Sequence, residues 1–312
     1  MAAGTMSHAE YSKTPRVPIR TPRTLSESSD DREATIGGIA RAAARMGEGG
    51  RGSMRAPAEL QSWPGIVHGG AAVALLDAAV GLSGPRIVEG RLTSSLPLES
   101  DLDLDAEPFE TGTTVIVRRD GLVLTSATIR PADVASLSPA AWRGGTRGRA
   151  LPMSDDCLAC GAGNPVGLRI ELSFDETGVW ARFVPGAAWR AGDEALHPAL
   201  FPVALDEVAW WLGALVAQDG GLTNRICVTF TGSPGRWGEP VVAAGRFEDV
   251  TPIDRRRAFW RTETAIAAAD GEVLASASIV FRGGPEYSSL QIPYFRSRTA
   301  PEVFRRMFPN HA

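Results

Sequence analysis

Two segments of this chain repeat one pattern, well over a hundred residues apart. His68-Gly-Gly-Ala-Ala-Val-Ala-Leu-Leu-Asp77 and His197-Pro-Ala-Leu-Phe-Pro-Val-Ala-Leu-Asp206 each place an aspartate nine residues after a histidine, in an otherwise apolar run. A second pair, Asp120-Gly-Leu-Val-Leu-Thr-Ser-Ala-Thr-Ile129 and Asp270-Gly-Glu-Val-Leu-Ala-Ser-Ala-Ser-Ile279, shares an Asp-Gly turn and five further identities. A repeat at this spacing indicates two whole domains of one fold rather than a solenoid of short repeats.

Length, charge and cysteine content agree with a two-domain cytoplasmic protein. The 312 residues suit two domains of roughly 150 residues each. A formal net charge of -4 argues against a nucleic-acid partner. Three cysteines are too few for a disulfide framework, so we expect a reducing cytoplasm. The longest apolar helix candidate, Val203 to Ala217, contains Asp206 and Glu207 and is too short and too charged to span a bilayer.

Composition shifts predict where the domains begin and end. Residues 1–45 read as a disordered N-terminal tail, because a stretch rich in Ser, Thr, Pro and Arg buries too little apolar surface to offset its ordering entropy; a short helix over Ala34 to Met46 is possible at its end. The hexapeptide Gly47 to Gly52 fits a dinucleotide-binding pattern, but no strand precedes it, so we expect a flexible loop. The further divisions are a first domain over 46–140, a linker over 141–156, a second domain over 157–285 and a C-terminal extension over 286–312.

Each domain is predicted to contain one long apolar helix followed by strands. The helices run from Gly69 to Ser83 and from Leu200 to Gln218. Because the first is hydrophobic all round, it must be buried on nearly every side, and an α+β fold in which an antiparallel sheet wraps the helix satisfies that need. The expected strands are Arg91 to Leu98, Leu102 to Phe109, Thr113 to Arg119 and Leu122 to Arg130, then Leu168 to Phe174, Val179 to Val184, Arg225 to Thr231, Val241 to Asp249, Ala258 to Ala268 and Glu272 to Arg282.

Three motifs resemble the hotdog-fold thioesterases of the phenylacetate-pathway branch. They are Trp63-Pro-Gly-Ile-Val-His-Gly-Gly70 continuing to Asp77, Cys157-Leu-Ala-Cys-Gly-Ala-Gly-Asn-Pro-Val-Gly-Leu168, and Leu205-Asp-Glu207. The resemblance implies two tandem hotdog domains, each an antiparallel sheet around one central helix, packed as an intramolecular pseudo-dimer on a continuous sheet. It also implies that each active site joins the glycine turn of one hotdog to the helix carboxylate of the other.

Site one would join His68, Gly69 and Gly70 to Asp206, with Glu207 as a further candidate. Thioester hydrolysis needs donors aimed at the developing oxyanion and a base beyond the carbonyl. Glycines at a helix N-terminus present free backbone N–H groups and the positive end of the helix dipole. The alternative for Asp206 is a buried structural carboxylate, and the alternative for His68 is a side chain that only locks the turn.

Site two would join Asp77 to His197, and it looks degenerate. The position that matches Gly69 is Pro198, which has no backbone N–H to donate. We therefore expect one working site per chain.

Two other sets of residues are weaker candidates. Cys157 and Cys160 have zinc-knuckle spacing, but no second ligand pair lies nearby in sequence, so a structural loop is favoured and no metal is expected. Five arginines at or near strand ends either hold coenzyme A phosphates or form a solvated edge: Arg118, Arg119, Arg255, Arg256 and Arg257.

The leading expectation is hydrolysis of an acyl thioester, with acyl-coenzyme A as the small-molecule partner and no cofactor. One alternative is a hotdog hydratase or dehydratase, which the absence of an Asp-x-Asn-x-x-His pattern disfavours. Another is a non-catalytic module that binds acyl thioesters or acts as a scaffold. Self-association of the double-hotdog chains and the identity of the acyl group are left open by the sequence.

Overall fold

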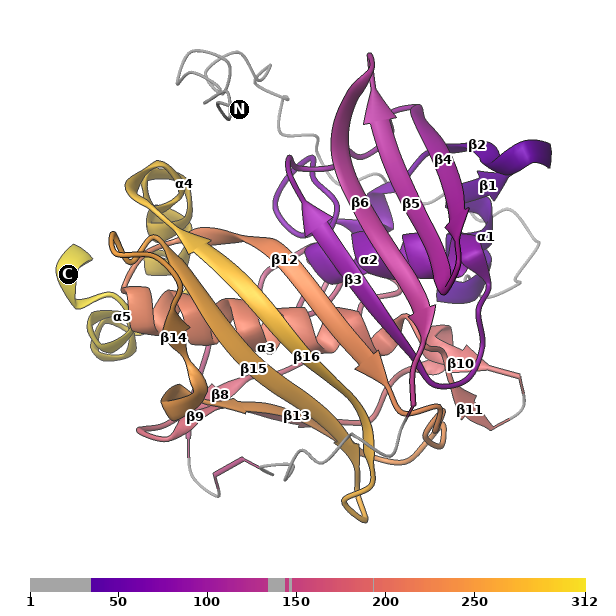
Figure 1. The fold of residues 1–312 in the computed structure, drawn as a ribbon. Helices are drawn as coiled ribbons and strands as arrows, with labels where there is room; N and C mark the ends of the chain where they lie inside the picture. Colours follow the sequence, from indigo (N-terminus) through magenta and orange to yellow (C-terminus); the bar gives the residue numbers. More distant parts are fainter. Residues whose placement is uncertain (1–34, 134–143, 146–147, 193) are drawn as a thin grey trace, which may run out of the picture. The chain divides into compact units, whose positions relative to one another are not determined.

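One antiparallel sheet runs through both halves of the molecule. The computed structural model describes residues 35–133, 144–145, 148–192 and 194–312. Within them, a 14-stranded sheet has the order β1-β2-β4-β5-β6-β3-β12-β16-β15-β13-β9-β8-β7, with β14 paired to β15 (Figure 1). The order of the central strands shows two equivalent halves joined edge to edge.

The first half surrounds helix α2, Gly69–Val80, and the second surrounds helix α3, Leu200–Ala217. The first half contains β2 (Arg51–Met54), β3 (Arg86–Leu92), β4 (Leu102–Phe109), β5 (Gly112–Arg119) and β6 (Leu122–Pro131). The second contains β9 (Gly178–Phe183), β12 (Gly221–Phe230), β13 (Val241–Arg246), β15 (Phe259–Ala268) and β16 (Val273–Gly283). The orders β2-β4-β5-β6-β3 and β9-β13-β15-β16-β12 are the same, which is the repeat that the sequence predicts.

The two halves meet along β3 and β12. These strands pair antiparallel from Arg225 opposite Arg91 to Phe230 opposite Arg86. Beneath this seam, α2 and α3 contact each other. The predicted antiparallel sheets around central helices, packed as a pair on one continuous sheet, are therefore confirmed.

Local sequence explains why these elements form. The turn between β5 and β6 places Asp120 at φ 52° and Gly121 at φ 79°, the backbone of the two-residue hairpin turn that favours Asp-Gly. In β6 the buried side chains alternate at Thr125, Ala127 and Ile129, as a strand with one covered face requires. Helix α3 is the one described helix that is long and apolar enough to cross a membrane, and 78% of it is buried inside the protein.

Order begins earlier than the predicted tail boundary allows. Helix α1, Ile36–Ala43, and β1, Ala44–Met46, fall inside the 1–45 tail, while residues 1–34 lie outside the described residues. Thr35 caps α1 by accepting a hydrogen bond from the Gly38 N–H, and Ile36 is buried. The possible short helix over Ala34 to Met46 is therefore confirmed at Ile36–Ala43. The boundary of the disordered tail was placed too late, because this short helix buries its apolar side against α2.

Four other segments also differ from expectation. The glycine-rich segment 47–52 is not a flexible loop: it includes the short helix η2 (Glu48–Gly50) and the start of β2, which pairs with β1. Within the predicted linker, β7 (Arg149–Ala150) pairs with β8 (Ser173–Phe174), so that part belongs to the sheet. The predicted strand at 91–98 starts earlier, at Arg86, and ends at Leu92, and only the last two residues of the strand predicted at 168–174 form a strand.

The C-terminal extension is folded onto the second half. It contains α4 (Pro285–Arg296), α5 (Pro301–Met307) and η7 (Pro309–His311). The side chain of Gln291 accepts from the Gly221 N–H at 2.7 Å and donates to its carbonyl oxygen at 3.0 Å. The remaining short elements are η3 (Ala58–Leu60), η5 (Ala187–Trp189), β10 (Arg190–Ala191), β11 (Ala195–Leu196), η6 (Phe247–Asp249) and β14 (Thr251–Pro252).

Candidate active site at the junction of the two helices

The N-terminus of α2 lies against the N-terminal half of α3. His68 is the residue that caps α2, and its Nδ1 accepts a hydrogen bond from the Gly70 N–H at 3.2 Å. The same Gly70 N–H donates to Asp206 Oδ2 of α3 at 2.8 Å. The structure therefore brings together the glycine turn of one half and the helix aspartate of the other.

Close packing of the two helices explains the glycine pair. A Cβ on Gly70 would lie 2.2 Å from the carbonyl oxygen of Pro202, so only glycine fits where α2 crosses α3. A Cβ on Gly69 would lie 2.7 Å from Asp206 Oδ2. Glycine is therefore required at Gly70, and any side chain at Gly69 would displace the Asp206 carboxylate. This close approach lets a backbone N–H of α2 reach a carboxylate of α3.

Asp206 is buried and held from three directions. Thr223 on β12 donates from Oγ1 to Asp206 Oδ1 at 2.6 Å, and His68 Nδ1 lies 3.4 Å from Asp206 Oδ2. Burial raises the pKa of Asp206 above its ordinary value, while His68, Thr223 and the Gly70 N–H act in the opposite direction. A carboxylate in this environment is a stronger base than one in water.

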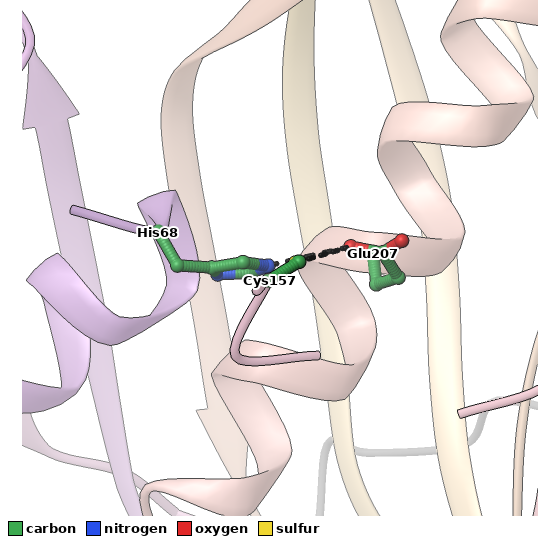
Figure 2. Close-up of side chains that lie close together, drawn as sticks. All are labelled: His68, Cys157 and Glu207. Atoms are coloured by element: carbon green, nitrogen blue, oxygen red, sulfur yellow. Dashed lines mark hydrogen bonds and ion pairs between the residues drawn. The ribbon is translucent and has the colours of Figure 1, made fainter. Parts of the chain in front are cut away.

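Glu207 and Cys157 complete the cluster on the other side of the imidazole (Figure 2). His68 Nε2 lies 3.4 Å from Glu207 Oε2, and the Cys157 thiol donates to the same oxygen at 3.9 Å. All three side chains are buried. Glu207, which the sequence offers as a further candidate, therefore contacts His68 directly.

The segment that carries Cys157 is fastened to the first half of the molecule. The Leu158 N–H donates to the carbonyl oxygen of Gln61 at 2.7 Å, and Asn164 Nδ2 donates to that of Glu59 at 2.8 Å. These bonds place Cys157 beside His68. The sequence did not predict that Cys157 lies beside His68, because the spacing of a Cys-x-x-Cys pair gives no information about residues that are distant in sequence.

The histidine and the thiol polarise each other. Burial by itself would lower the pKa of His68, but hydrogen bonds to Cys157 and Glu207 and the charge of Asp206 outweigh it and raise the pKa well above 6.5. A hydrogen bond from Cys160, aided by His68, lowers the pKa of Cys157 to about 6 against the effects of burial and Glu207. Thr223 and Cys157 are the two neighbours of the predicted site that sequence reasoning missed.

The second predicted site is not assembled. Asp77 accepts from Arg86 Nε at 2.8 Å and from Arg86 Nη2 at 2.5 Å, and both side chains are buried. Burial raises the pKa of Asp77, although the Arg86 hydrogen bonds and charge oppose that effect. Among the described residues, no hydrogen bond or ion pair joins Asp77 to His197.

His197 lies just before the start of α3, between that helix and α1. Its Nδ1 accepts from the Ala199 N–H at 3.2 Å, and its Nε2 lies against Gly37 of α1. Burial, with a smaller contribution from the charge of Arg41, lowers the pKa of His197 to about 4. The loss of the site in this half of the repeat stays a prediction.

The predicted phosphate-binding arginines lie at strand ends, several with protein partners. Arg118 Nε lies 3.3 Å from Asp105, and Arg119 Nε lies 3.8 Å from Asp120. The guanidinium of Arg257 lies over the ring of Trp260, 4.8 Å from its centroid, and Arg255 and Arg256 are exposed. Coenzyme A binding by this set stays a prediction.

Comparison with known proteins identifies the fold. No model of a protein family and no curated protein matches the sequence. A hotdog-fold protein of unknown function from Alicyclobacillus acidocaldarius aligns over 80% of this chain and 97% of its own, with 15% identity and a TM-score of 0.58.

Two further solved structures are similar to the same degree. A protein from Novosphingobium aromaticivorans proposed to be a thioesterase aligns over 78% of this chain and 98% of its own, with 16% identity and a TM-score of 0.55. The dehydratase domain of PpsC from Mycobacterium tuberculosis, in complex with C12:1-CoA, aligns over 77% and 97%, with 16% identity and a TM-score of 0.51. Together with the strand order, these similarities show that the chain has the hotdog fold in both of its halves.

Proposed function

We propose that the chain hydrolyses an acyl thioester, with coenzyme A as the carrier, at the junction of α2 and α3. The observation that carries the proposal is the hydrogen bond of 2.8 Å from the Gly70 N–H to a carboxylate oxygen of Asp206. It places a backbone donor at the positive end of a 12-residue helix opposite an anionic oxygen. Such a donor stabilises the oxyanion that forms when a thioester carbonyl is attacked.

In the proposed reaction the thioester carbonyl oxygen replaces Asp206 Oδ2 on the Gly70 N–H. Asp206, still held by Thr223, then takes a proton from water as the oxygen of that water bonds to the carbonyl carbon. The carbon–sulfur bond breaks, and the thiolate leaves and takes up the proton. His68 positions the turn, because its Nδ1 accepts from the same N–H.

A specific observation also favours a second candidate, the hydration or dehydration of an acyl thioester. His68 of one half lies within 3.4 Å of Glu207 of the other, and an imidazole beside a carboxyl group is a base and an acid at close range. The PpsC dehydratase domain shares the fold and was solved with an acyl-CoA. In this reaction the Glu207 carboxylate removes a proton beside the carbonyl, and His68, whose raised pKa favours the imidazolium, protonates the leaving hydroxyl.

Product analysis separates these functions. The purified protein is incubated with a panel of saturated, 3-hydroxy and 2-unsaturated acyl-coenzyme A esters, and free coenzyme A and acyl-chain unsaturation are followed together. Hydrolysis releases coenzyme A, and Asp206→Asn abolishes most of that release. Asp219→Asn, which changes a carboxylate just beyond the far end of α3, is the matched control and leaves it unchanged.

The other outcomes contradict the hydrolase proposal. A change in unsaturation without release of coenzyme A supports the second candidate. Saturable binding without any turnover supports a module that binds acyl thioesters. Equal hydrolysis by the Asp206→Asn variant and the parent protein would show that the reaction takes place elsewhere.

A further inference from the structure

Three buried side chains from three separate segments converge beside the proposed catalytic carboxylate. His68 comes from the start of α2, Glu207 from α3, and Cys157 from the loop that opens the second half (Figure 2). The ligand-type atoms of these residues all lie within 4.8 Å of one another. The proposed hydrolysis assigns no chemical role to Cys157 and none to the convergence of these three groups.

We propose that His68, Cys157 and Glu207 form a binding site for one divalent transition-metal ion of the zinc class. The inference stands apart from the proposed hydrolysis, whose reacting groups are Asp206 and the Gly70 N–H. A thiolate with an imidazole favours zinc over magnesium or calcium, which prefer oxygen ligands. Three protein ligands and one open position are the arrangement of many catalytic zinc sites.

Two of the three distances between these side chains are close to the spacing of metal ligands, and the third pair, His68 and Cys157, lies within 4.8 Å. Tetrahedral coordination at ordinary zinc bond lengths puts neighbouring ligand atoms about 3.3 to 3.6 Å apart. In the structure, His68 Nε2 and Glu207 Oε2 are 3.4 Å apart, and Cys157 Sγ and Glu207 Oε2 are 3.9 Å apart. An ion among these atoms therefore needs only small side-chain shifts.

The surroundings of the imidazole also fit. Metal-binding histidines usually donate their second ring nitrogen to a carboxylate or a backbone carbonyl, which fixes the ring orientation. His68 turns Nε2 toward Cys157 and Glu207, and its Nδ1 lies 3.4 Å from Asp206 Oδ2. With Nε2 on the ion, Nδ1 would carry the proton and donate to Asp206, and the Gly70 N–H would donate to Asp206 alone, from which it is 2.8 Å away; Asp206 would then take the outer position of a carboxylate–histidine–metal arrangement.

Charge balance gives an independent argument. Asp206 and Glu207 are both buried, and His68 is the one basic side chain that either contacts among the described residues. Cys157 adds a third acidic group to the same cluster. Buried acidic groups are usually protonated, paired or bound to a metal, and a dipositive ion is a partner that matches this excess of acidic over basic side chains.

Cobalt is a suitable probe because a thiolate bound to Co²⁺ produces an intense near-ultraviolet absorption band. The full-length protein, reduced and stripped of metal with a chelator, is titrated with Co²⁺ and then with Zn²⁺. We expect one equivalent of Co²⁺ to produce the band and Zn²⁺ to displace it. Cys157→Ser should abolish the band, and His68→Gln and Glu207→Gln should each weaken Zn²⁺ binding at least about tenfold in competition with a chromogenic chelator.

Cys160→Ser and Cys227→Ser are the matched controls. Cys160 is the other member of the Cys-x-x-Cys pair but is not among the three converging groups, and Cys227 lies on β12. Both variants should keep the band and the stoichiometry. Zn²⁺ should also raise the unfolding temperature of the parent protein and of both controls but not that of Cys157→Ser, a comparison that holds even where a variant is less stable.

Three results would overturn the site. The parent protein fails to take up one equivalent of either ion, the band survives in Cys157→Ser, or Cys160→Ser loses the band as completely as Cys157→Ser does. The last result would mean that the cysteine pair, rather than the proposed trio, holds the ion.

Discussion

Asp77 and Asp206 occupy the same place in the repeat but have opposite partners. Each lies on the central helix of its half and is held by a side chain from the strand that follows that helix. For Asp77 that side chain is Arg86 of β3, at 2.5 and 2.8 Å. For Asp206 it is Thr223 of β12, at 2.6 Å.

The partner side chain distinguishes Asp77, a structural carboxylate, from Asp206, the proposed reactive one. A guanidinium neutralises Asp77 and takes up both of its oxygens in a two-pronged pair. A hydroxyl orients Asp206 without neutralising it and leaves its other oxygen for the Gly70 N–H of the opposite half. A duplicated motif therefore fixes where a carboxylate lies, and its neighbours decide what it does.

The largest expected effect compares the two aspartates directly. Asp206→Asn should lower thioester hydrolysis by about 10²–10⁴-fold, the scale for losing a general base. Asp77→Asn should lower the rate per folded molecule far less, because Asp77 is neutralised by Arg86. Steady-state release of coenzyme A, normalised to the folded fraction, measures both rates. Equal losses of rate in the two variants would contradict the assignment of the reaction to Asp206 alone.

Stability should show the reverse order. Asp77→Asn leaves the buried Arg86 without its counter-ion, so we expect the free energy of unfolding to fall by about 3–5 kcal/mol. Asp206→Asn keeps a side chain of the same shape that can still hydrogen bond, so its change should stay within about 1 kcal/mol. Urea unfolding measures both. The double variant Asp77→Leu/Arg86→Met, which removes both charges, is the control and should regain most of the loss.

The buried imidazole of His197 should make the stability of the protein depend on pH. The pKa of His197 is about 4 in the folded protein and near 6.5 when unfolded, so between these values the unfolded state binds more protons. The contribution of His197 to stability is therefore complete above pH 6.5 and is lost as the pH falls toward 4, by up to about 3 kcal/mol. His197→Gln should lack this loss.

Urea unfolding of the parent and the His197→Gln variant at several pH values measures that difference. Burial raises the pKa of Asp77 and Asp206, so their contributions have the opposite sign and would obscure a single curve. Subtracting the free energy of unfolding of the variant from that of the parent at each pH removes the contributions of the two aspartates. A difference that does not change between pH 6.5 and 4 would show that His197 is not held neutral.

The smallest predicted effect concerns the hydroxyl that orients Asp206. Thr223→Val should lower hydrolysis by about tenfold, the value of one hydrogen bond to a charged group. Thr223→Ser keeps the hydroxyl and should restore the rate to within about twofold. A serine variant as slow as the valine variant would mean that Thr223 acts through packing of its methyl group instead.

Periodicity predicted the fold well where hydrophobic pattern and turn chemistry are both local. The bounds of β4, Leu102–Phe109, match the expected strand, and α3 begins at Leu200 as expected. The pattern was less informative toward the ends of the chain: it allowed the short helix α1 but placed it in a disordered tail, and it predicted no elements for 286–312. Helix α1 and the C-terminal helices gain their stability from contacts with distant elements, such as the hydrogen bonds of Gln291 to Gly221, and local sequence does not show such contacts.

The sequence by itself predicted the duplication, the glycine turn at His68 to Gly70 and the carboxylates of α3, because each is visible as a pattern in short segments of the chain. Only the tertiary structure decided the partners. Arg86 and Thr223 lie on strands whose own patterns carry no mark of a site. The Cys-x-x-Cys loop is visible in the sequence, but its position beside His68 is not. The roles of these residues follow from the close crossing of α2 and α3, where Gly70 leaves no room for a Cβ beside Pro202, and proximity of that kind comes from the packing of the whole molecule.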